Sequence, residues 1–326
     1  MQLHPNRLQW VGFAELALAQ CAVGVNVVTG KYLIAYFPIF LLLMLRFGIG
    51  LISMLMMVKL KRSSTWDWYR HFCLLSSKDK FLLFIQAMCG GFLFNILLLF
   101  GMRNTNAAAA GIINGITPVL ILVLSFIFLR EKITWRIVIA MIVAVAGLWI
   151  LNTGKEGNSV VLGNGLIFLA VIPEAFFTIL SKLFGNKLNQ FEIVILINLF
   201  NLFVFIPFAM VSLNDISLLA IPIESYLILL LYGFSGGLLF FLLWYQGLTK
   251  VAANKAALFT AVMPISTTVL AYIFLKESLH LSEIIGMCLV VSAIFIGCFV
   301  PASLSSTGYV DDYKKNKLLS QSETIQ

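Results

Sequence analysis

Two charged side chains stand inside long apolar stretches, and they are the first candidates for chemistry. Arg46 lies about nine residues into the run 37–58 and Glu174 about twelve residues into the run 162–183. If both runs are helices that cross a bilayer, these charges lie ~13 Å and ~18 Å deep. A charge at the bilayer centre costs at least ~2.5–3.5 kcal/mol on insertion scales. Each residue must therefore face a partner or water.

Two interpretations of this pair stay open. In the structural one, Arg46 pairs with Glu174, or with backbone carbonyl groups, and locks parts of the molecule together. In the functional one, Arg46 receives a carboxylate or phosphate of a substrate, while Glu174 receives an amine or a proton. The second interpretation makes Glu174 the candidate for proton coupling.

Other polar residues recur at helical spacing around these charges. Thr178 and Ser181 follow Glu174 at i+4 and i+7, on one helix face. Similar faces carry Gly50 and Ser53 after Arg46, Asn114 with Pro118 and Ser125, Thr260 with Pro264, Thr267 and Thr268, and the pair Asn198 and Asn201. The residues predicted to bind substrate are Arg46, Glu174, Asn114, Thr178, Asn198 and Thr260. The alternative is that Ser, Thr and Asn only hold helices together, at ~0.6 kcal/mol each on average.

Four residues are candidates for hinges or gates: Pro118, Pro264, Glu131 and Glu277. A proline frees a backbone carbonyl near mid-helix and permits bending. The two glutamates each follow a Phe-Leu-basic sequence, where capping and anchoring a helix hairpin is the alternative to gating. The pairs Gly90-Gly91 and Gly236-Gly237 lie inside apolar runs, so they indicate close helix packing instead of phosphate binding. Trp244 and Tyr245 could stack on a ligand, but they favour an aromatic belt at the membrane interface.

The elements that must position these residues are membrane helices. Apolar residues make up 61% of 326 and charged residues 11%, with a mean hydropathy of +1.00, whereas a soluble domain carries about 25% charge. The composition predicts an all-α integral membrane protein. Its ten apolar runs are 10–29, 37–58, 81–102, 106–129, 134–152, 162–183, 190–212, 225–247, 251–275 and 282–300.

The formal net charge is +8, and the lysine and arginine residues that produce it are unevenly distributed along the chain. If the N-terminus is cytoplasmic, 17 of the 22 Lys and Arg residues lie in cytoplasmic segments. The positive-inside rule then places both termini in the cytoplasm. We expect a multi-pass protein of the plasma (inner) membrane whose partners are a small-molecule substrate and the lipid bilayer, without nucleic acid. A homodimer is left open.

Enzyme chemistry is disfavoured by the residues available. All aspartates fall in loops or the tail, the three histidines are scattered, and no serine has a histidine partner in a helix. The five cysteines show neither disulfide nor metal spacing. No catalytic residue, metal or cofactor is expected. A passive channel would need a continuous polar ring, and a scaffolding protein would not need the two midplane charges.

An internal repeat predicts how the helices are arranged. The segment Pro118 to Glu131 matches Pro264 to Glu277 at an offset of 146 residues, with seven of fourteen positions identical. The same offset carries Gly90-Gly91 onto Gly236-Gly237 and Asn114 onto Thr260. Each unit holds five helices, an odd number, so the second copy is predicted to be inverted in the membrane. Inverted repeats are typical of secondary transporters that work by alternating access.

These boundaries divide the chain into four parts. They are a cytoplasmic N-terminus (1–9), a first five-helix repeat (10–152), a second, inverted repeat (162–300) and a cytoplasmic tail (301–326) with a polar composition that favours disorder.

The residues also resemble a known family. "NAAAAGIINGITPVLILVLSFIFLREKITW", "ANKAALFTAVMPISTTVLAYIFLKESLHL", "GVNVVTGKYL" and "LRFGIGL" are similar to EamA-type domains, in the ten-helix branch of the drug/metabolite transporter superfamily. The resemblance implies a central cavity lined by helices one to four and six to nine, with helices five and ten as buttresses. It implies transport of small solutes, among them amino acids, nucleotide-linked metabolites and nucleobases. Two departures are the absence of a second-half match for Arg46 and the charge of Glu174.

The function expected is a secondary transporter of a small polar or zwitterionic metabolite, amino-acid-like, with proton coupling through Glu174. The alternative is an exchanger of organic anions or nucleotide-like metabolites read by Arg46 and Lys255. An intramembrane enzyme or a structural membrane protein is the alternative from a different class.

Overall fold

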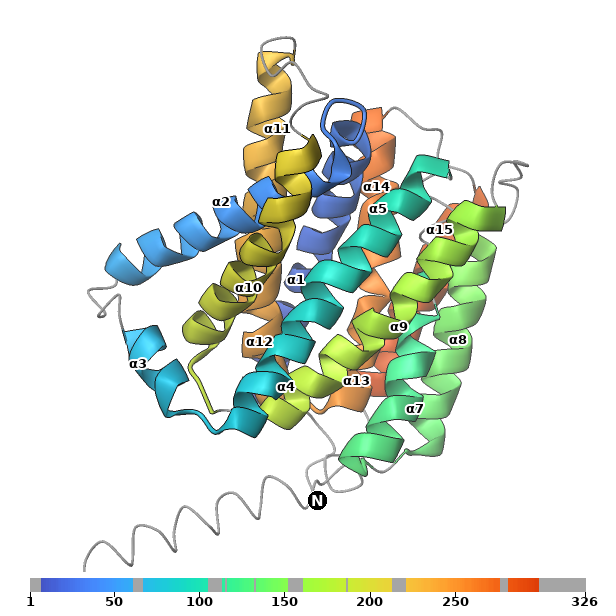
Figure 1. Ribbon diagram of the computed structural model, residues 1–326. Helices are drawn as coiled ribbons and strands as arrows, with labels where there is room; N and C mark the ends of the chain where they lie inside the picture. Colours follow the sequence, from blue (N-terminus) through green and yellow to red (C-terminus); the bar gives the residue numbers. More distant parts are fainter. Residues whose placement is uncertain are drawn as a thin grey trace, which may run out of the picture.

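The computed structural model describes residues 7–60, 67–104, 113–114, 116–131, 133–151, 161–185, 187–212, 221–275 and 281–298. In these ranges the chain is helical, with short turns between the helices (Figure 1). The helices are α1 (Arg7–Leu33), α2 (Ile39–Leu60), α3 (Asp67–Leu74), α4 (Ser77–Ala87), the π-helix η1 (Met88–Leu93), α5 (Phe94–Asn104), α7 (Thr117–Leu129), α8 (Trp135–Leu151), α9 (Val161–Phe184), α10 (Gln190–Ser212), α11 (Ile223–Gly233), the π-helix η4 (Phe234–Leu239), α12 (Phe240–Lys250), α13 (Ala253–Thr260), α14 (Val262–Leu275) and α15 (Leu281–Cys298).

The molecule has the surface of a membrane protein. Large apolar side chains point outward along the bundle, for example Met56, Phe126 and Phe274 at 64%, 59% and 69% exposure. Within the described residues, seven helical stretches are long and apolar enough to cross a bilayer, and each of the ten predicted runs contains a helix. The prediction of an all-α integral membrane fold is confirmed. Of the run 106–129, residues 106–112 and 115 lie outside the described residues.

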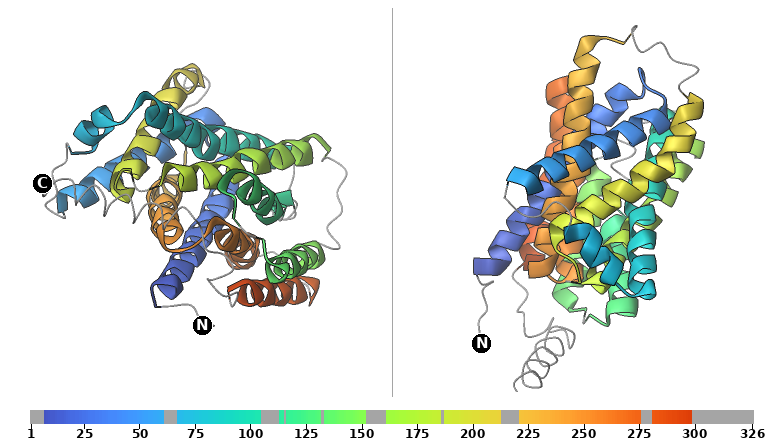
Figure 2. Two further views of the ribbon diagram at one scale, coloured as in Figure 1. Left: turned by 90° about the horizontal axis from the view of Figure 1, so that it is seen from below. Right: turned by 60° about the vertical axis from the view of Figure 1, so that its left-hand side comes forward.

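Helices α8 and α15 pack along each other at one side of the bundle, as both figures show (Figures 1 and 2). Both keep outward faces that are apolar, with Ile142 and Val291 among the exposed residues. By contrast, all eight residues of α13 are buried. α13 packs against α1, α7 and α9, so it lies at the centre of one end of the molecule.

Two helices are each interrupted by one π-helical segment, a feature that the apolar runs do not predict. η1 separates α4 from α5, and η4 separates α11 from α12; the two segments begin 146 residues apart, at Met88 and Phe234. In Figure 1 the chain runs upward from α4 to α5 and downward from α11 to α12. The two corresponding interrupted helices therefore run in opposite directions. π-Helical turns are rare and frequently mark functional sites.

The glycine pairs lie within these π-helical segments and permit close contacts, as predicted. A Cβ atom on Gly237 would lie 2.7 Å from Cα of Gly50 on α2, and one on Gly91 would lie 2.1 Å from the amide of Asn201 on α10. Real Cβ contacts are essentially never shorter than 3.0 Å. Only glycine allows these helices to approach so closely.

The two prolines predicted as hinges, Pro118 and Pro264, lie at helix starts instead of mid-helix. Pro118 lies in the first turn of α7 and Pro264 in the first turn of α14, where the missing N–H costs no helical hydrogen bond. Ahead of Pro264, α13 ends at Thr260 and α14 begins at Val262. The break in the ninth predicted run therefore comes before the proline.

Candidate functional site

Glu174 occupies the middle of α9, directly after Pro173, which lies inside the same helix. Its Oε2 accepts a hydrogen bond of 3.0 Å from the hydroxyl of Thr117, a buried residue at the start of α7. Thr178, one turn later, is 1% exposed and donates to the backbone carbonyl of Glu174 over 3.4 Å. The side chain of Glu174 is thus directed at the point where α7 begins.

The carboxylate of Glu174 has no cationic partner among the described residues. The ion pairs found there join His71 to Glu192, Lys187 to Asp79 and Lys250 to Glu15. The structure therefore does not contain the Arg46–Glu174 ion pair that one form of the structural interpretation predicts. Glu174 is a half-buried acid whose side-chain partner among the described residues is one neutral hydroxyl group.

Asn114 lies three residues before Thr117 and is 5% exposed. Within the part of the chain that the structure describes, neither its amide nitrogen nor its amide oxygen has a hydrogen-bond partner. A buried amide without partners costs free energy, about 1–3 kcal/mol for each group in mutational data. Such groups are expected where a solute or water completes the bonding. Thr260, the residue at the corresponding place in the second half, is 6% exposed and donates to the carbonyl of Ala257 over 2.7 Å.

Arg46 is engaged with protein atoms from several helices. Its Nη1 donates to Oδ1 of Asn95 on α5, and its Nη2 donates to the carbonyl oxygen of Gly236 in η4 over 3.3 Å. The guanidinium group also lies over the rings of Phe47 and Tyr232, with Cζ 5.1 Å and 5.5 Å from the ring centroids. At 4% exposure, Arg46 keeps only Nε without an acceptor.

The amide of Asn95 extends this connection to the first π-helical segment. Its Nδ2 donates to the carbonyl groups of Gly90 and Gly91, over 3.2 Å and 2.6 Å. Arg46 and Asn95 therefore form a continuous polar bridge between η1 and η4. This arrangement agrees with the structural interpretation of Arg46, in the form in which it pairs with backbone carbonyl groups.

Asn198 and Asn201 of α10 bind backbone groups of the same two interrupted helices. Asn198 donates to the carbonyl of Gly237 over 2.8 Å, and Asn201 donates to that of Ala87 over 3.1 Å. Both residues are fully buried. Each retains an amide oxygen without a partner.

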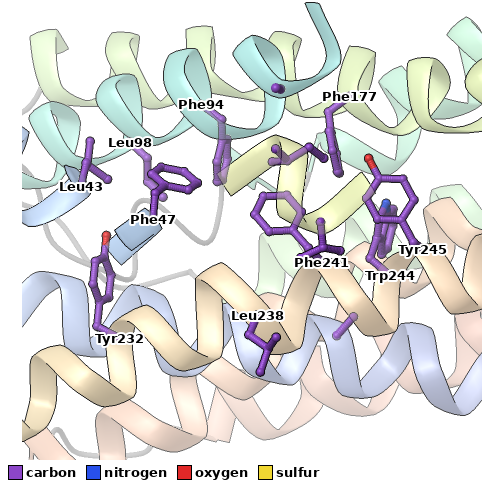
Figure 3. Packing of buried hydrophobic residues seen from close by; sticks show 14 of the residues in the cluster. Leu43, Phe47, Phe94, Leu98, Phe177, Tyr232, Leu238, Phe241, Trp244 and Tyr245 are labelled. Atoms are coloured by element: carbon purple, nitrogen blue, oxygen red, sulfur yellow. The ribbon is translucent and has the colours of Figure 1, made fainter. Parts of the chain in front are cut away.

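A third polar cluster was not predicted. The side chain of Gln86 on α4 donates to the hydroxyl groups of Ser181, over 2.8 Å, and of Tyr245. Phe177 packs edge-on against Tyr245 (Figure 3). Because Trp244 and Tyr245 are 1% and 4% exposed, the prediction of an interfacial aromatic belt is wrong for both. Membrane-facing and inward-facing aromatic residues look alike in a sequence that is apolar on all sides.

The predicted gate residues have different surroundings. Glu131 is 3% exposed, and its carboxylate accepts hydrogen bonds from the backbone N–H groups of Ala253 and Asn254 at the start of α13. Pro118 and Pro264 are buried near the helix starts described above. Glu277 lies outside the described residues. Among those residues, no group of three or more His, Cys, Asp or Glu is placed to hold a metal ion.

Comparison with known proteins supplies a family. The profile of the EamA-like transporter family matches residues 10–153 and again residues 161–297. The uncharacterized transporter YetK of Bacillus subtilis is 34% identical over 88% of this chain and 87% of its own. The uncharacterized transporter YvbV of the same organism is 29% identical over 83% of this chain and 86% of its own.

Two further similarities are more distant. An uncharacterized transporter of Archaeoglobus fulgidus is 26% identical over 67% of this chain and 78% of its own. A solved crystal structure superimposes with a TM-score of 0.70 at 16% identity, covering 90% of this chain and 98% of that chain. At that identity the similarity concerns the fold alone.

Proposed function

This chain belongs to the EamA-like transporter family, and we propose that it carries a small, amine-bearing polar metabolite, amino-acid-like, through a site centred on Glu174. It is an integral multi-pass membrane transporter and not an enzyme. We propose the solute class, the proton coupling and the cytoplasmic location of both termini.

The observation that carries the proposal is the bonding of Glu174. An ionised carboxylate away from bulk water needs charge-assisted partners, and here one hydroxyl supplies a single hydrogen bond. A primary ammonium group of a solute would supply up to three donors and the missing positive charge. Glu174 is therefore the group best suited to bind a cationic amine in this molecule.

Asn114 supports a second contact with the same solute. Its unpartnered amide offers both a donor and an acceptor close to Thr117. A carboxylate or hydroxyl group of the solute would accept from the Asn114 nitrogen. An amino acid satisfies both residues with one small molecule, and this is why we favour an amino-acid-like solute over a simple amine.

Alternating access follows from the arrangement of the two interrupted helices. The units at 10–152 and 162–300 would exchange shapes about the central site, as inverted repeats do in secondary transporters. The opposite directions of α4–η1–α5 and α11–η4–α12 support this. Proton coupling would result if Glu174 holds a proton when it does not hold the amine, since both ligands compete for one carboxylate.

A second candidate is exchange of organic anions. It is favoured by Lys255, a cation on α13 that is 4% exposed. Arg46 would complete an anion site, but its two terminal nitrogen atoms bind Asn95 and Gly236. We therefore rank the amine-binding site first. The lysine and arginine distribution supports both termini in the cytoplasm, and we propose a plasma (inner) membrane location.

The test is transport by the purified protein in liposomes. A panel of amino acids, amines and organic anions is supplied with and without a pH gradient. Glu174→Gln is expected to abolish proton-linked uptake of amine-bearing solutes, whereas Glu224→Gln, at the exposed start of α11, leaves it unchanged. Wild-type transport of anions alone, or a pH dependence that Glu174→Gln does not alter, would refute the proposal.

A further inference from the structure

Glu131 ties the end of one helix to the start of another. It follows the end of α7, and its Oε1 and Oε2 accept hydrogen bonds from the N–H groups of Ala253 (3.0 Å) and Asn254 (2.9 Å). These N–H groups are in the first turn of α13, where a helix has unsatisfied donors and partial positive charge. A carboxylate bonded to two such donors is a strong, directional contact.

The backbone before Glu131 is shaped for this contact. Arg130 has a φ of 53°, which makes it the sole non-glycine residue with a left-handed backbone among the described residues. Glycine would adopt that conformation without strain, whereas arginine does not. The turn closes α7, since the Arg130 N–H bonds the Ser125 carbonyl, and it is followed directly by the buried Glu131. Strained residues of this kind cluster at functional positions.

Further charged side chains surround the same turn between α12 and α13. Lys182 of α9 donates to the carbonyl oxygens of Leu248 and Val251. Lys250, at the end of α12, pairs with Glu15 of α1. We call the Glu131, Lys182 and Glu15–Lys250 contacts around residues 248–254 the clasp. The clasp therefore connects α1, α7 and α9 to a single short turn.

Two of these contacts join the first half of the chain to the second. Glu131 and Glu15 come from the first half, while Ala253, Asn254 and Lys250 come from the second. A carrier with a central site must separate its halves at this end to let a solute pass. Hydrogen bonds suit a reversible closure, because each is replaced by bonds to water once the passage is wet, at a small net cost.

We propose that the Glu131 carboxylate is the closing bond of a gate at this end of the bundle. The passage from Glu174 toward the turn 248–254 is shut while Glu131 holds the first turn of α13, and it opens when the carboxylate leaves. Lys182 stabilises the turn, and the Glu15–Lys250 pair is a second closing contact. This inference rests on the proposed function only in requiring a solute path on this side of Glu174.

Cysteine accessibility tests the gate without knowledge of the solute. The five native cysteines are replaced by serine or alanine, and Thr178→Cys, one turn from Glu174 on the way to Lys182, serves as reporter. A maleimide that cannot cross lipid is applied to right-side-out and to inverted vesicles. Glu131→Gln, which removes the charge and one acceptor, is expected to raise the labelling rate from the face that carries residue 131 about tenfold. That change corresponds to about 1.4 kcal/mol.

A second variant changes the donor, instead of the acceptor, of the same contact. Ala253→Pro removes one N–H donor and leaves Glu131 intact, and proline is tolerated at the first helical position. The preceding residue, Ala252, already has the extended backbone (φ −67°, ψ 152°) that a following proline requires. It should raise labelling from the same face, and the double variant should show less than the product of the two single effects, because both changes weaken the same contact.

Glu192→Gln is the matched control. Glu192 also accepts a backbone N–H at a helix start, that of Asn189 at 2.9 Å, but it lies outside the clasp. Its labelling should equal that of the unmodified reporter. Glu131→Gln and Ala253→Pro proteins that elute as monodisperse, folded species and label at the reporter's own rate would overturn the gate, leaving Glu131 a structural helix cap. Loss of transport on Glu174→Gln is a separate result, since labelling needs no solute.

Discussion

The close backbone contact between α2 and η4 makes a sharp prediction about Gly50. A Cβ atom there would lie 2.5 Å from Oδ1 of Asn198 and 2.7 Å from Cα of Gly237. An ordinary contact is 3.4–4 Å, so α2 would have to move away from η4 by about 0.7–1.3 Å. Because one of the clashing atoms belongs to the backbone, a side-chain rotation cannot relieve the strain.

The size of the effect of Gly50→Ala follows from three contributions. Overpacking of this kind costs about 1–3 kcal/mol. Movement of α2 also stretches the Arg46–Gly236 hydrogen bond, already 3.3 Å long, which adds about 1 kcal/mol. The higher helix propensity of alanine returns about 0.8–1 kcal/mol. We expect a net loss of about 2 kcal/mol in the free energy of unfolding.

Gly48 of the same helix is the control. A Cβ atom there has its nearest neighbour at 3.7 Å, on Leu202, so Gly48→Ala should gain up to about 1 kcal/mol from helix propensity. The two variants should therefore differ by about 3 kcal/mol. Reversible unfolding in mixed detergent micelles, followed by circular dichroism, measures this difference. Equal stability of the Gly50→Ala and Gly48→Ala proteins would refute the close contact between α2 and η4.

Two other predictions concern Arg46 and Arg130. Arg46→Lys and Asn95→Ala should each lower the free energy of unfolding by about 2–3 kcal/mol, and their double variant should lose about 1–3 kcal/mol less than the sum, since both break one bridge; additive losses in the same unfolding assay would contradict the bridge. Arg130→Gly should be at least as stable as the wild type, whereas Arg130→Val should lose about 1–2 kcal/mol, because a β-branched residue fits a φ of 53° poorly. Thermal midpoints in detergent measure the order, and the reverse order would mean that residue 130 is not left-handed.

Many features of the fold could be read from the residues because they depend on local properties. Apolar runs of sufficient length become membrane helices wherever they occur, since backbone groups in lipid must bond within the segment. The Gly-Gly pairs indicated close packing correctly, because only a missing side chain permits it. The π-helical form of those segments was not predicted. Asn198 and Asn201 of α10 bind carbonyl groups of these interrupted helices, and Asn95, just after η1, binds those of Gly90 and Gly91.

In the candidate site, the difference between what one residue determines and what contacts between distant residues determine is even clearer. The cost of a charge in the bilayer singled out Arg46 and Glu174, but it did not reveal their partners. Arg46 binds residues 49 and 190 positions away, and Glu174 binds one 57 positions away. The hydrogen bond between Gln86 and Tyr245, 159 positions apart, could not be predicted. The residues next to Gln86 in the sequence do not indicate whether its side chain is buried or exposed.

By itself, the sequence determined the class of protein, its repeat and the few charged or amide side chains that a membrane interior must accommodate. The tertiary structure alone decided that Arg46 connects the two π-helical segments while Glu174 is left with a single hydroxyl. The physical reason is that burial cost belongs to one residue and its helix, whereas a hydrogen bond needs two atoms within about 3 Å. That distance is set by how helices cross, and the crossings depend on contacts between glycines such as Gly50 and Gly237, which are far apart in the chain.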